Sequence, residues 1–172
     1  WSGVYFAYRY LTGSDVHANK ICLFEASERI GGRTYSKHVE VDTPKGNIEK
    51  YVIDVGAYRF SPDMHLPGDV ILKHLKLPTA CYEPDCEPAS KDFPPPFKFN
   101  YTAALRRIVD PETGLPAGYV TALNTMVAEM ESKGARVFRG KGLTDISLGN
   151  SGGATLQFQD GSRVFAGTVL LN

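Results

Sequence analysis

The apolar run Ile21-Cys-Leu-Phe24, followed directly by Glu25, limits the folds open to this chain more than any other feature. A continuous apolar run is typical of a parallel strand that is covered on both faces. Residues Ser2 to Leu11 predict a helix before it, with Gly3 and Ala7 spaced so that both lie on one face. A helix, a polar loop and a buried strand make up half of a right-handed βαβ unit. The sequence therefore predicts an α/β fold built on a parallel sheet.

Glu25 stands where a dinucleotide-binding fold places an acidic residue, at the end of its second strand. It follows Gly3 by 22 positions. That separation is close to the one between the glycine fingerprint and the carboxylate that accepts hydrogen bonds from ribose hydroxyls. A glutamate that only ends a strand in solvent fits the same spacing equally well. The residues after Glu25 favour the first interpretation.

The segment Glu25-Ala-Ser-Glu-Arg29-Ile-Gly31-Gly32-Arg33-Thr34 closely resembles the signature of the FAD-dependent amine oxidases, the family of monoamine, polyamine and L-amino-acid oxidases. Weaker likenesses follow in the family's order over essentially the whole chain, at Ser2-Gly3, Asp54-Val-Gly-Ala, Gly118-Tyr-Val-Thr-Ala-Leu123 and Gly142-Leu143. The resemblance implies an incomplete Rossmann-like domain for FAD or NAD(P), with a parallel sheet, helices and a β-hairpin or meander excursion. FAD is the implied cofactor, and the implied cofactor-binding residues are Gly3, Glu25, Ala26, Ser27, Arg29, Gly31, Gly32, Arg33, Gly56, Ala57, Tyr58, Arg59 and Leu143.

The residue types in this signature suit a pyrophosphate. Gly31 and Gly32 let the backbone approach closely where a Cβ would clash. Arg29 and Arg33 offer permanently charged, planar forks for phosphate oxygens. A Gly-Gly turn flanked by solvated arginines is the alternative interpretation, and the attachment to Glu25 and a buried strand speaks against it.

Arg59 carries the prediction about substrate. Gly56-Ala-Tyr-Arg59 resembles the segment of L-amino-acid oxidases in which the arginine holds the substrate carboxylate. A guanidinium matches a carboxylate in two parallel hydrogen bonds, whereas an amine without a carboxylate has no need of it. The alternative interpretation is an arginine in an ordinary surface ion pair.

The rest of the chain predicts further helices, strands and turns. Expected are strands at Thr34–Val41 and Tyr51–Val55 around a turn at Pro44–Gly46, a helix around Asp69–Leu75, a proline-rich connector at Pro78–Pro96, a helix at Tyr119–Ser132 ended by Gly134, a strand at Arg136–Phe138, a hairpin of Ala154–Phe158 and Arg163–Phe165, and a buried strand at Val169–Leu171. We expect one partial FAD-binding domain in three parts: residues 1–60, a mononucleotide-binding half without its first strand; residues 61–117, a helix and connector; and residues 118–172, with helix, strand, hairpin and return strand.

Composition excludes some partners. The 19 lysines and arginines equal the 19 aspartates and glutamates, so no long-range field favours nucleic acid or an anionic membrane. No apolar run is long enough to span a bilayer. Cys81 and Cys86 either form a short-loop disulfide or remain thiols, and the cysteines and histidines lack the spacing of a metal site. Asn100 begins a glycosylation sequon that has meaning only if the protein is secreted, so the compartment stays open.

The function implied by the resemblance is FAD-dependent oxidation of an L-amino acid, a small-molecule substrate, by O2 to a keto acid, with release of ammonia and hydrogen peroxide. No residue is assigned as a general base. An amine or polyamine oxidase, or a non-catalytic remnant of the fold that serves as a structural or partner-binding subunit, are the alternatives. Because the chain begins at Trp1 and ends on an apolar run, we expect a piece truncated at both ends. Such a piece would be inactive alone, and its association with the remainder of its protein or with a second copy stays open.

Overall fold

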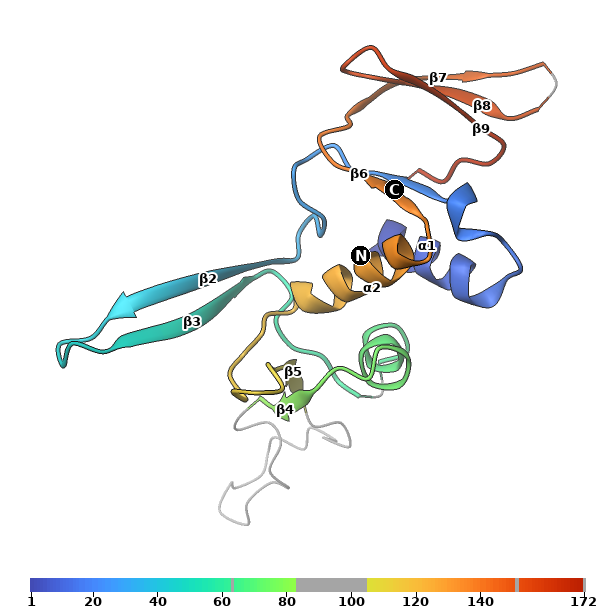
Figure 1. The fold of residues 1–172 in the computed structure, drawn as a ribbon. Coiled ribbons are helices and arrows are strands. Elements are labelled where there is room, and N and C mark those ends of the chain that lie inside the picture. The colour runs from blue at the N-terminus through green and yellow to red at the C-terminus, as the bar shows by residue number, and fades with distance from the viewer. Residues whose placement is uncertain (63, 83–104, 151, 172) are drawn as a thin grey trace, which may run out of the picture. The chain divides into compact units, whose positions relative to one another are not determined.

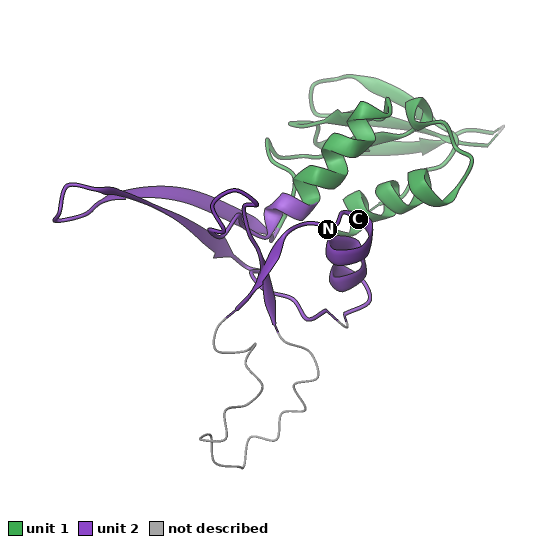
Figure 2. Ribbon diagram, turned by 60° about the horizontal axis from the view of Figure 1, so that its bottom comes forward, with its two compact units in different colours: residues 1–32, 123–172 green, residues 33–122 purple. Residues whose placement is uncertain are grey.

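The structure is a computed structural model that describes residues 1–62, 64–82, 105–150 and 152–171. Its elements in chain order are α1 (Ser2–Gly13), the 3-10 helix η1 (Ala18–Lys20), β1 (Cys22–Phe24), β2 (Tyr35–Asp42), β3 (Ile48–Val55), the π-helix η2 (Asp69–His74), β4 (Thr79–Cys81), β5 (Arg106–Ile108), α2 (Val120–Ser132), β6 (Arg136–Phe138), β7 (Leu143–Leu148), β8 (Ala154–Phe158) and β9 (Arg163–Ala166) (Figure 1). They form two compact units: unit 1 holds residues 1–32 and 123–172, and unit 2 holds residues 33–122 (Figure 2).

In unit 1, a helix precedes a strand of a parallel pair, as the sequence predicts. Helix α1 buries Val4, Ala7 and Tyr8. Strand β1 pairs in parallel with β6, and Phe24 lies opposite Phe138. The residues of β1 are only half-buried, because β6 is the single strand that pairs with β1 among the described residues. The parallel strand is confirmed, and its full burial on two faces is not.

A three-stranded antiparallel meander of β7, β8 and β9 completes the sheets of unit 1. The turn between β8 and β9 contains Asp160, whose carboxylate accepts hydrogen bonds from the N–H and O–H of Ser162 at 3.1 and 2.6 Å. Phe158 is buried, and its ring centroid lies 4.6 Å from that of Phe24. The predicted β8–β9 hairpin is therefore confirmed, and β7 is an additional strand.

In unit 2, β2 and β3 form an antiparallel hairpin in which Tyr35 lies opposite Val55 and Asp42 lies opposite Ile48 (Figure 1). Its turn is closed by the N–H of Thr43, which donates to the carbonyl oxygen of Asn47 at 2.8 Å. Both predicted strands and the turn are confirmed; β2 is shifted by one residue, and β3 begins three residues earlier than expected.

A second small sheet lies further along unit 2. Strand β4 pairs with β5 in antiparallel fashion, and Phe60, which is fully buried, makes a bridge to Arg106 on β5. The strand at Thr79–Cys81, which lies within the proline-rich segment and is fixed by backbone pairing with β5, was not predicted. The predicted helix near Asp69 is confirmed as η2, with the π-type bond from the N–H of Leu75 to the carbonyl oxygen of Val70.

Several predictions fall on residues outside the described ranges. Cys81 is in a disulfide and Cys22 is free, whereas Cys86 lies outside the described residues, as do Pro94–Pro96 and the sequon at Asn100. None of the helices in the described part of the chain is long and apolar enough to cross a membrane.

The predicted strand at Val169–Leu171 is wrong. These residues have no regular structure, and the side chains of Leu170 and Leu171 are 56% and 64% exposed. An apolar run becomes a strand only where another strand supplies its hydrogen bonds, and no described residue does so here. The observed fold is thus a mixture of helices and small sheets with one parallel pair, and the Rossmann-like sheet remains a prediction.

Candidate functional site

The Glu25 carboxylate is fixed by its own turn. The backbone N–H of Glu25 donates to the carbonyl oxygen of Phe138 at 2.8 Å, which places the residue at the end of the parallel pair. Its Oε1 accepts hydrogen bonds from the backbone N–H and the hydroxyl of Ser27, both at 2.8 Å. The other carboxylate oxygen has no hydrogen bond within the described ranges and is the one that suits an external hydroxyl.

Helix α1, whose first turn contains Gly3, contacts β1, the strand that Glu25 directly follows. The first turn of a helix presents free backbone N–H groups and the positive end of the dipole, which favour an anion.

The glycine pair is held by Arg29, whose Nη2 donates to the carbonyl oxygen of Gly32 at 2.8 Å. Gly31 and Gly32 have φ angles of 129° and 56°, which a residue with a Cβ adopts at a cost. No atom lies within 4 Å of the position that a Cβ on Gly32 would take. The loop therefore leaves open space beside Gly32, as a cradle for a phosphate requires. Contact of Arg29 with phosphate stays a prediction.

A second glycine-containing segment lies beside Ser27. The N–H of Gly140 donates to the carbonyl oxygen of Ser27 at 3.0 Å, and the N–H of Lys141 donates to that of Glu25 at 2.9 Å. These bonds bring the segment that leads to Leu143, a residue 39% exposed, to the Glu25 turn. The role of Gly140 and Lys141 was not predicted, although the pattern Gly-Lys-Gly directly before Leu143 is a signal for it.

In unit 2, Arg33 and Gly56 approach each other closely. Gly56 has a φ of 96°, and a Cβ on it would lie 2.1 Å from the carbonyl oxygen of Arg33. The two predicted cofactor segments of this unit therefore meet at a position that only glycine can fill. Ala57 and Tyr58 follow Gly56 and are exposed.

Arg59 lies against aromatic rings. Its guanidinium carbon is 5.1 Å from the ring centroid of Tyr58 and 5.5 Å from that of Tyr82, and these two rings meet edge to face at 5.5 Å. Such packing against two rings restricts the rotamers of a long side chain. The role of Tyr82 was not predicted, since it lies 23 positions from Arg59.

Ser36 and Asp54, on the β2–β3 hairpin, cap helix α2. The Ser36 hydroxyl donates to Asp54 Oδ1 in a short hydrogen bond. The same Oδ1 accepts from the N–H of Tyr119 at 2.9 Å, and Ser36 Oγ accepts from the N–H of Val120 at 3.2 Å. Sequence reasoning missed this cap because its residues come from strands and not from the turn before the helix, where a capping residue is normally sought.

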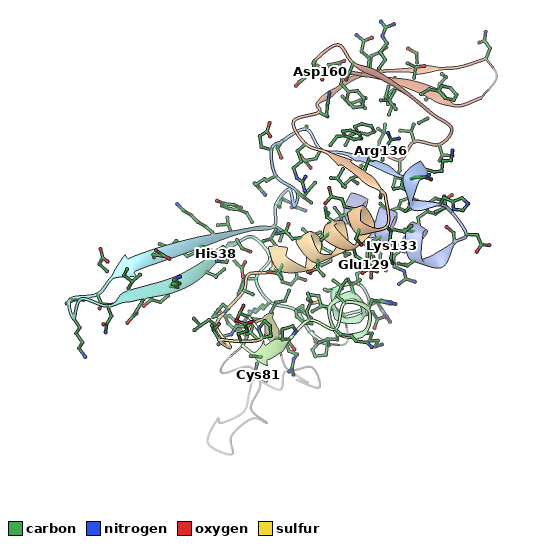
Figure 3. All side chains as sticks on the ribbon, in the orientation of Figure 1. His38, Cys81, Glu129, Lys133, Arg136 and Asp160 are labelled. Carbon is green, nitrogen blue, oxygen red and sulfur yellow. The ribbon has the colours of Figure 1, made fainter. Side chains whose placement is uncertain are left out.

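The clearest pKa shifts belong to groups outside the predicted site. Burial, helped by a hydrogen bond of 3.0 Å to Glu129, raises the pKa of Tyr8 to about 12. The hydrogen bond from Lys133 lowers the pKa of Glu129, and that from Lys141 lowers the pKa of Asp160 (Figure 3). These groups are paired with one another through hydrogen bonds, and they give no candidate for a general acid or base among the described residues.

The predicted site residues thus form two groups, one in each unit. The group in unit 1 is Gly3, Glu25, Ala26, Ser27, Arg29, Gly31, Gly32 and Leu143, and the group in unit 2 is Arg33, Gly56, Ala57, Tyr58 and Arg59. Within unit 1, the open space at Gly32 and the second carboxylate oxygen of Glu25 suit the pyrophosphate and the ribose of a ligand such as FAD. A comparison with curated proteins found no match to the chain. Residues 7–88, a little under half of the chain, match the family model of the flavin containing amine oxidoreductases, and this match indicates FAD as the cofactor and a flavin-dependent oxidoreductase as the class.

Proposed function

We propose that this chain is the FAD-binding part of an oxidoreductase that acts on L-amino acids. The match of residues 7–88 to flavin containing amine oxidoreductases supports the class. The observation that carries the substrate is Arg59, which lies three residues after Gly56 and packs against the rings of both Tyr58 and Tyr82.

In this proposal, residues of the chain hold the cofactor through its adenosine and phosphates. Glu25 accepts hydrogen bonds from ribose hydroxyls with its free oxygen. The open backbone at Gly32 and the guanidinium of Arg33 face the pyrophosphate. When bound, FAD supplies the capacity to accept two electrons from the carbon–nitrogen bond of the substrate.

Arg59 orients the substrate. Its planar guanidinium binds the α-carboxylate in two parallel hydrogen bonds, which fixes the amino acid by one end. The flanking rings limit the rotamers of Arg59, so less conformational entropy is lost when the substrate binds.

The cofactor assignment is tested with two matched glycine variants. Gly32 and Gly46 both have positive φ angles, 56° and 75°, and neither has an atom within 4 Å of its Cβ position. Replacement by alanine therefore adds similar backbone strain, about 1 kcal/mol, at both positions. We expect Gly32→Ala to weaken FAD binding at least about tenfold, because its Cβ fills the phosphate cradle, and Gly46→Ala to leave it unchanged. FAD binding is measured by quenching of flavin fluorescence. Equal affinities for both variants would contradict the assignment.

The substrate assignment is tested on the native protein that contains these residues. We expect it to show flavin absorbance bands, to oxidise L-amino acids and to lose this activity in Arg59→Ala with FAD still bound. Arg163→Ala, at an exposed arginine of unit 1, is the control. Oxidation of benzylamine or spermine that survives Arg59→Ala would instead indicate an amine or polyamine oxidase. A colourless protein that takes up no flavin would indicate the non-catalytic remnant.

A further inference from the structure

The turn that contains Glu25 is held in unit 1 by the end of β6 and the segment that follows it. The N–H of Glu25 donates to the carbonyl oxygen of Phe138 at 2.8 Å, and its own carbonyl oxygen accepts from the N–H of Lys141 at 2.9 Å. The N–H of Gly140 donates to the carbonyl oxygen of Ser27 at 3.0 Å. Both backbone polar groups of Glu25 are therefore bonded to one segment, and the position of that segment determines where the carboxylate lies.

The side chain of Lys141 is bonded to a different part of unit 1, the turn between β8 and β9, which contains Asp160 (Figure 3). Its Nζ forms an ion pair with Asp160 Oδ2 and lies 3.3 Å from the hydroxyl oxygen of Ser162. The other oxygen of Asp160 accepts hydrogen bonds from the N–H and the hydroxyl of Ser162. The Lys141 and Asp160 side chains are 27% and 47% exposed, so water screens this pair only in part.

The next residue, Gly142, is held by the same turn. The N–H of Gln159 donates to the carbonyl oxygen of Gly142 at 2.8 Å, and a Cβ on Gly142 would lie 2.5 Å from Oε1 of Gln159. Lys141 therefore joins two turns that are distant in the sequence. Its main chain is bonded to Glu25, and its side chain is bonded to Asp160.

The Glu25 carboxylate depends on the position of its turn. Its Oε1 accepts hydrogen bonds from the N–H and the hydroxyl of Ser27, both at 2.8 Å, so the side chain keeps a fixed direction relative to the backbone. The other oxygen is without a hydrogen bond in the described part of the chain. A hydrogen bond to an external hydroxyl tolerates only a few tenths of an ångström in distance. A shift of the backbone at Glu25 is therefore transmitted directly to this oxygen.

We propose that Lys141 is a positioning residue for the cofactor: its ion pair with Asp160 keeps the Glu25 turn where the carboxylate meets the ribose of FAD. This inference rests on the proposed function, in which Glu25 accepts hydrogen bonds from the ribose hydroxyls. Lys141 acts through its backbone N–H and makes no contact with the cofactor. Without the ion pair, the segment is attached on one side only, and the binding of FAD then includes the entropic cost of ordering it.

The test compares two lysines of unit 1 that each pair with a carboxylate. FAD affinity is measured by quenching of flavin fluorescence, on the apo form of the native protein that contains these residues. We expect Lys141→Gln to weaken FAD binding about fivefold, the upper end of the range for a surface ion pair. The matched control is Lys133→Gln, which removes the ion pair with Glu129 and should leave FAD affinity unchanged. Equal losses for the two lysines would reduce the effect to general destabilisation and overturn the inference.

A second readout distinguishes positioning from a purely structural role. Glu25→Gln should weaken FAD binding about tenfold, because a charge-assisted hydrogen bond is lost. Because Lys141 acts through Glu25, adding Lys141→Gln to Glu25→Gln should cause no further loss. Asp160→Asn should match Lys141→Gln, and Lys141→Arg, which keeps the charge, should retain most of the affinity.

The outcomes separate this inference from the proposed function. Unchanged FAD affinity in Lys141→Gln, or losses that multiply in the double variant with Glu25→Gln, would overturn the role of Lys141 and leave the proposed function in place. Unchanged affinity in Glu25→Gln would contradict the role of Glu25 in the proposed function itself. If Lys141→Gln unfolds, Asp160→Asn gives the same test, because it keeps an acceptor for Ser162 and removes only the charge.

Discussion

The cap that Ser36 and Asp54 place on helix α2 should be one of the largest single contributions to the stability of unit 2. Asp54 Oδ1 accepts hydrogen bonds from the Ser36 hydroxyl and the N–H of Tyr119, and Ser36 Oγ accepts from the N–H of Val120. Asp54→Ala removes an acceptor from two donors at once and takes a negative charge away from the helix N-terminus.

The magnitude follows from these contacts. Loss of a capping side chain costs about 0.5–2 kcal/mol, and loss of a carboxylate at a partly buried helix N-terminus costs up to about 2 kcal/mol. We therefore expect Asp54→Ala to lower the free energy of unfolding by about 2–3 kcal/mol. Asp54→Asn keeps an acceptor and loses the charge, so we expect it to lower the free energy of unfolding by about 1 kcal/mol. Ser36→Ala should also cost about 1 kcal/mol, because its buried hydroxyl donates to Asp54 Oδ1 and accepts from the N–H of Val120.

Chemical unfolding in guanidinium chloride, followed by circular dichroism, measures these differences. The control is Asp42→Ala, which removes an exposed aspartate from the far end of the same hairpin. We expect it to change stability by less than about 0.5 kcal/mol. A double-mutant cycle on Ser36 and Asp54 should give a coupling free energy of about 1 kcal/mol or more. If Asp54→Ala costs no more than Asp42→Ala, the cap does not hold the helix and the reasoning is refuted.

Two further substitutions probe other contacts. Gly56→Ala should destabilise the chain by more than about 2 kcal/mol, because its Cβ would lie 2.1 Å from the carbonyl oxygen of Arg33, whereas Gly46→Ala meets no atom and adds only backbone strain; thermal unfolding of both variants checks this. Tyr8→Phe should cost about 1 kcal/mol at pH 7 through loss of the hydrogen bond to Glu129. Because the folded protein raises the pKa of Tyr8 to about 12, the contribution of this phenol is complete below its ordinary pKa near 10. This contribution is lost as the pH rises through about 12. The difference in free energy of unfolding between the wild type and Tyr8→Phe should therefore be smaller at pH 11 than at pH 7.

The sequence predicts elements well where local pattern and pairing agree. The apolar run before Glu25 became β1 because β6 supplies its hydrogen bonds. The apolar run at Val169–Leu171 has the same pattern and is no strand, because no described strand pairs with it. Leu143–Leu148 is the opposite case. Its threonine, aspartate and serine interrupt the apolar pattern, yet the segment is a strand because β8 pairs with it. A hydrophobic pattern indicates which residues are buried, whereas strand pairing depends on the whole fold and cannot be read from one segment.

The site shows the same limit. The segment from Glu25 to Arg33 was recognisable because its residues are consecutive and act through backbone shape, which glycines determine locally. Tyr82 was not recognisable, because it lies 23 positions after Arg59 and only the folded chain brings its ring centroid to 5.5 Å from the guanidinium carbon of Arg59.

The hairpin explains how two predicted cofactor segments, which are distant in the sequence, lie together within unit 2. Arg33 precedes β2 and Gly56 follows β3, and Tyr35 opposite Val55 puts the two ends of the hairpin at the same level. The length of the hairpin does not enter this argument, because every residue added to both strands leaves its base unchanged. The register of the hairpin matters, because a slip by one residue would move the buried Ser36 to the other face and break the cap on α2. The cap on α2 and the approach of Gly56 to Arg33 therefore require the same register of the β2–β3 hairpin.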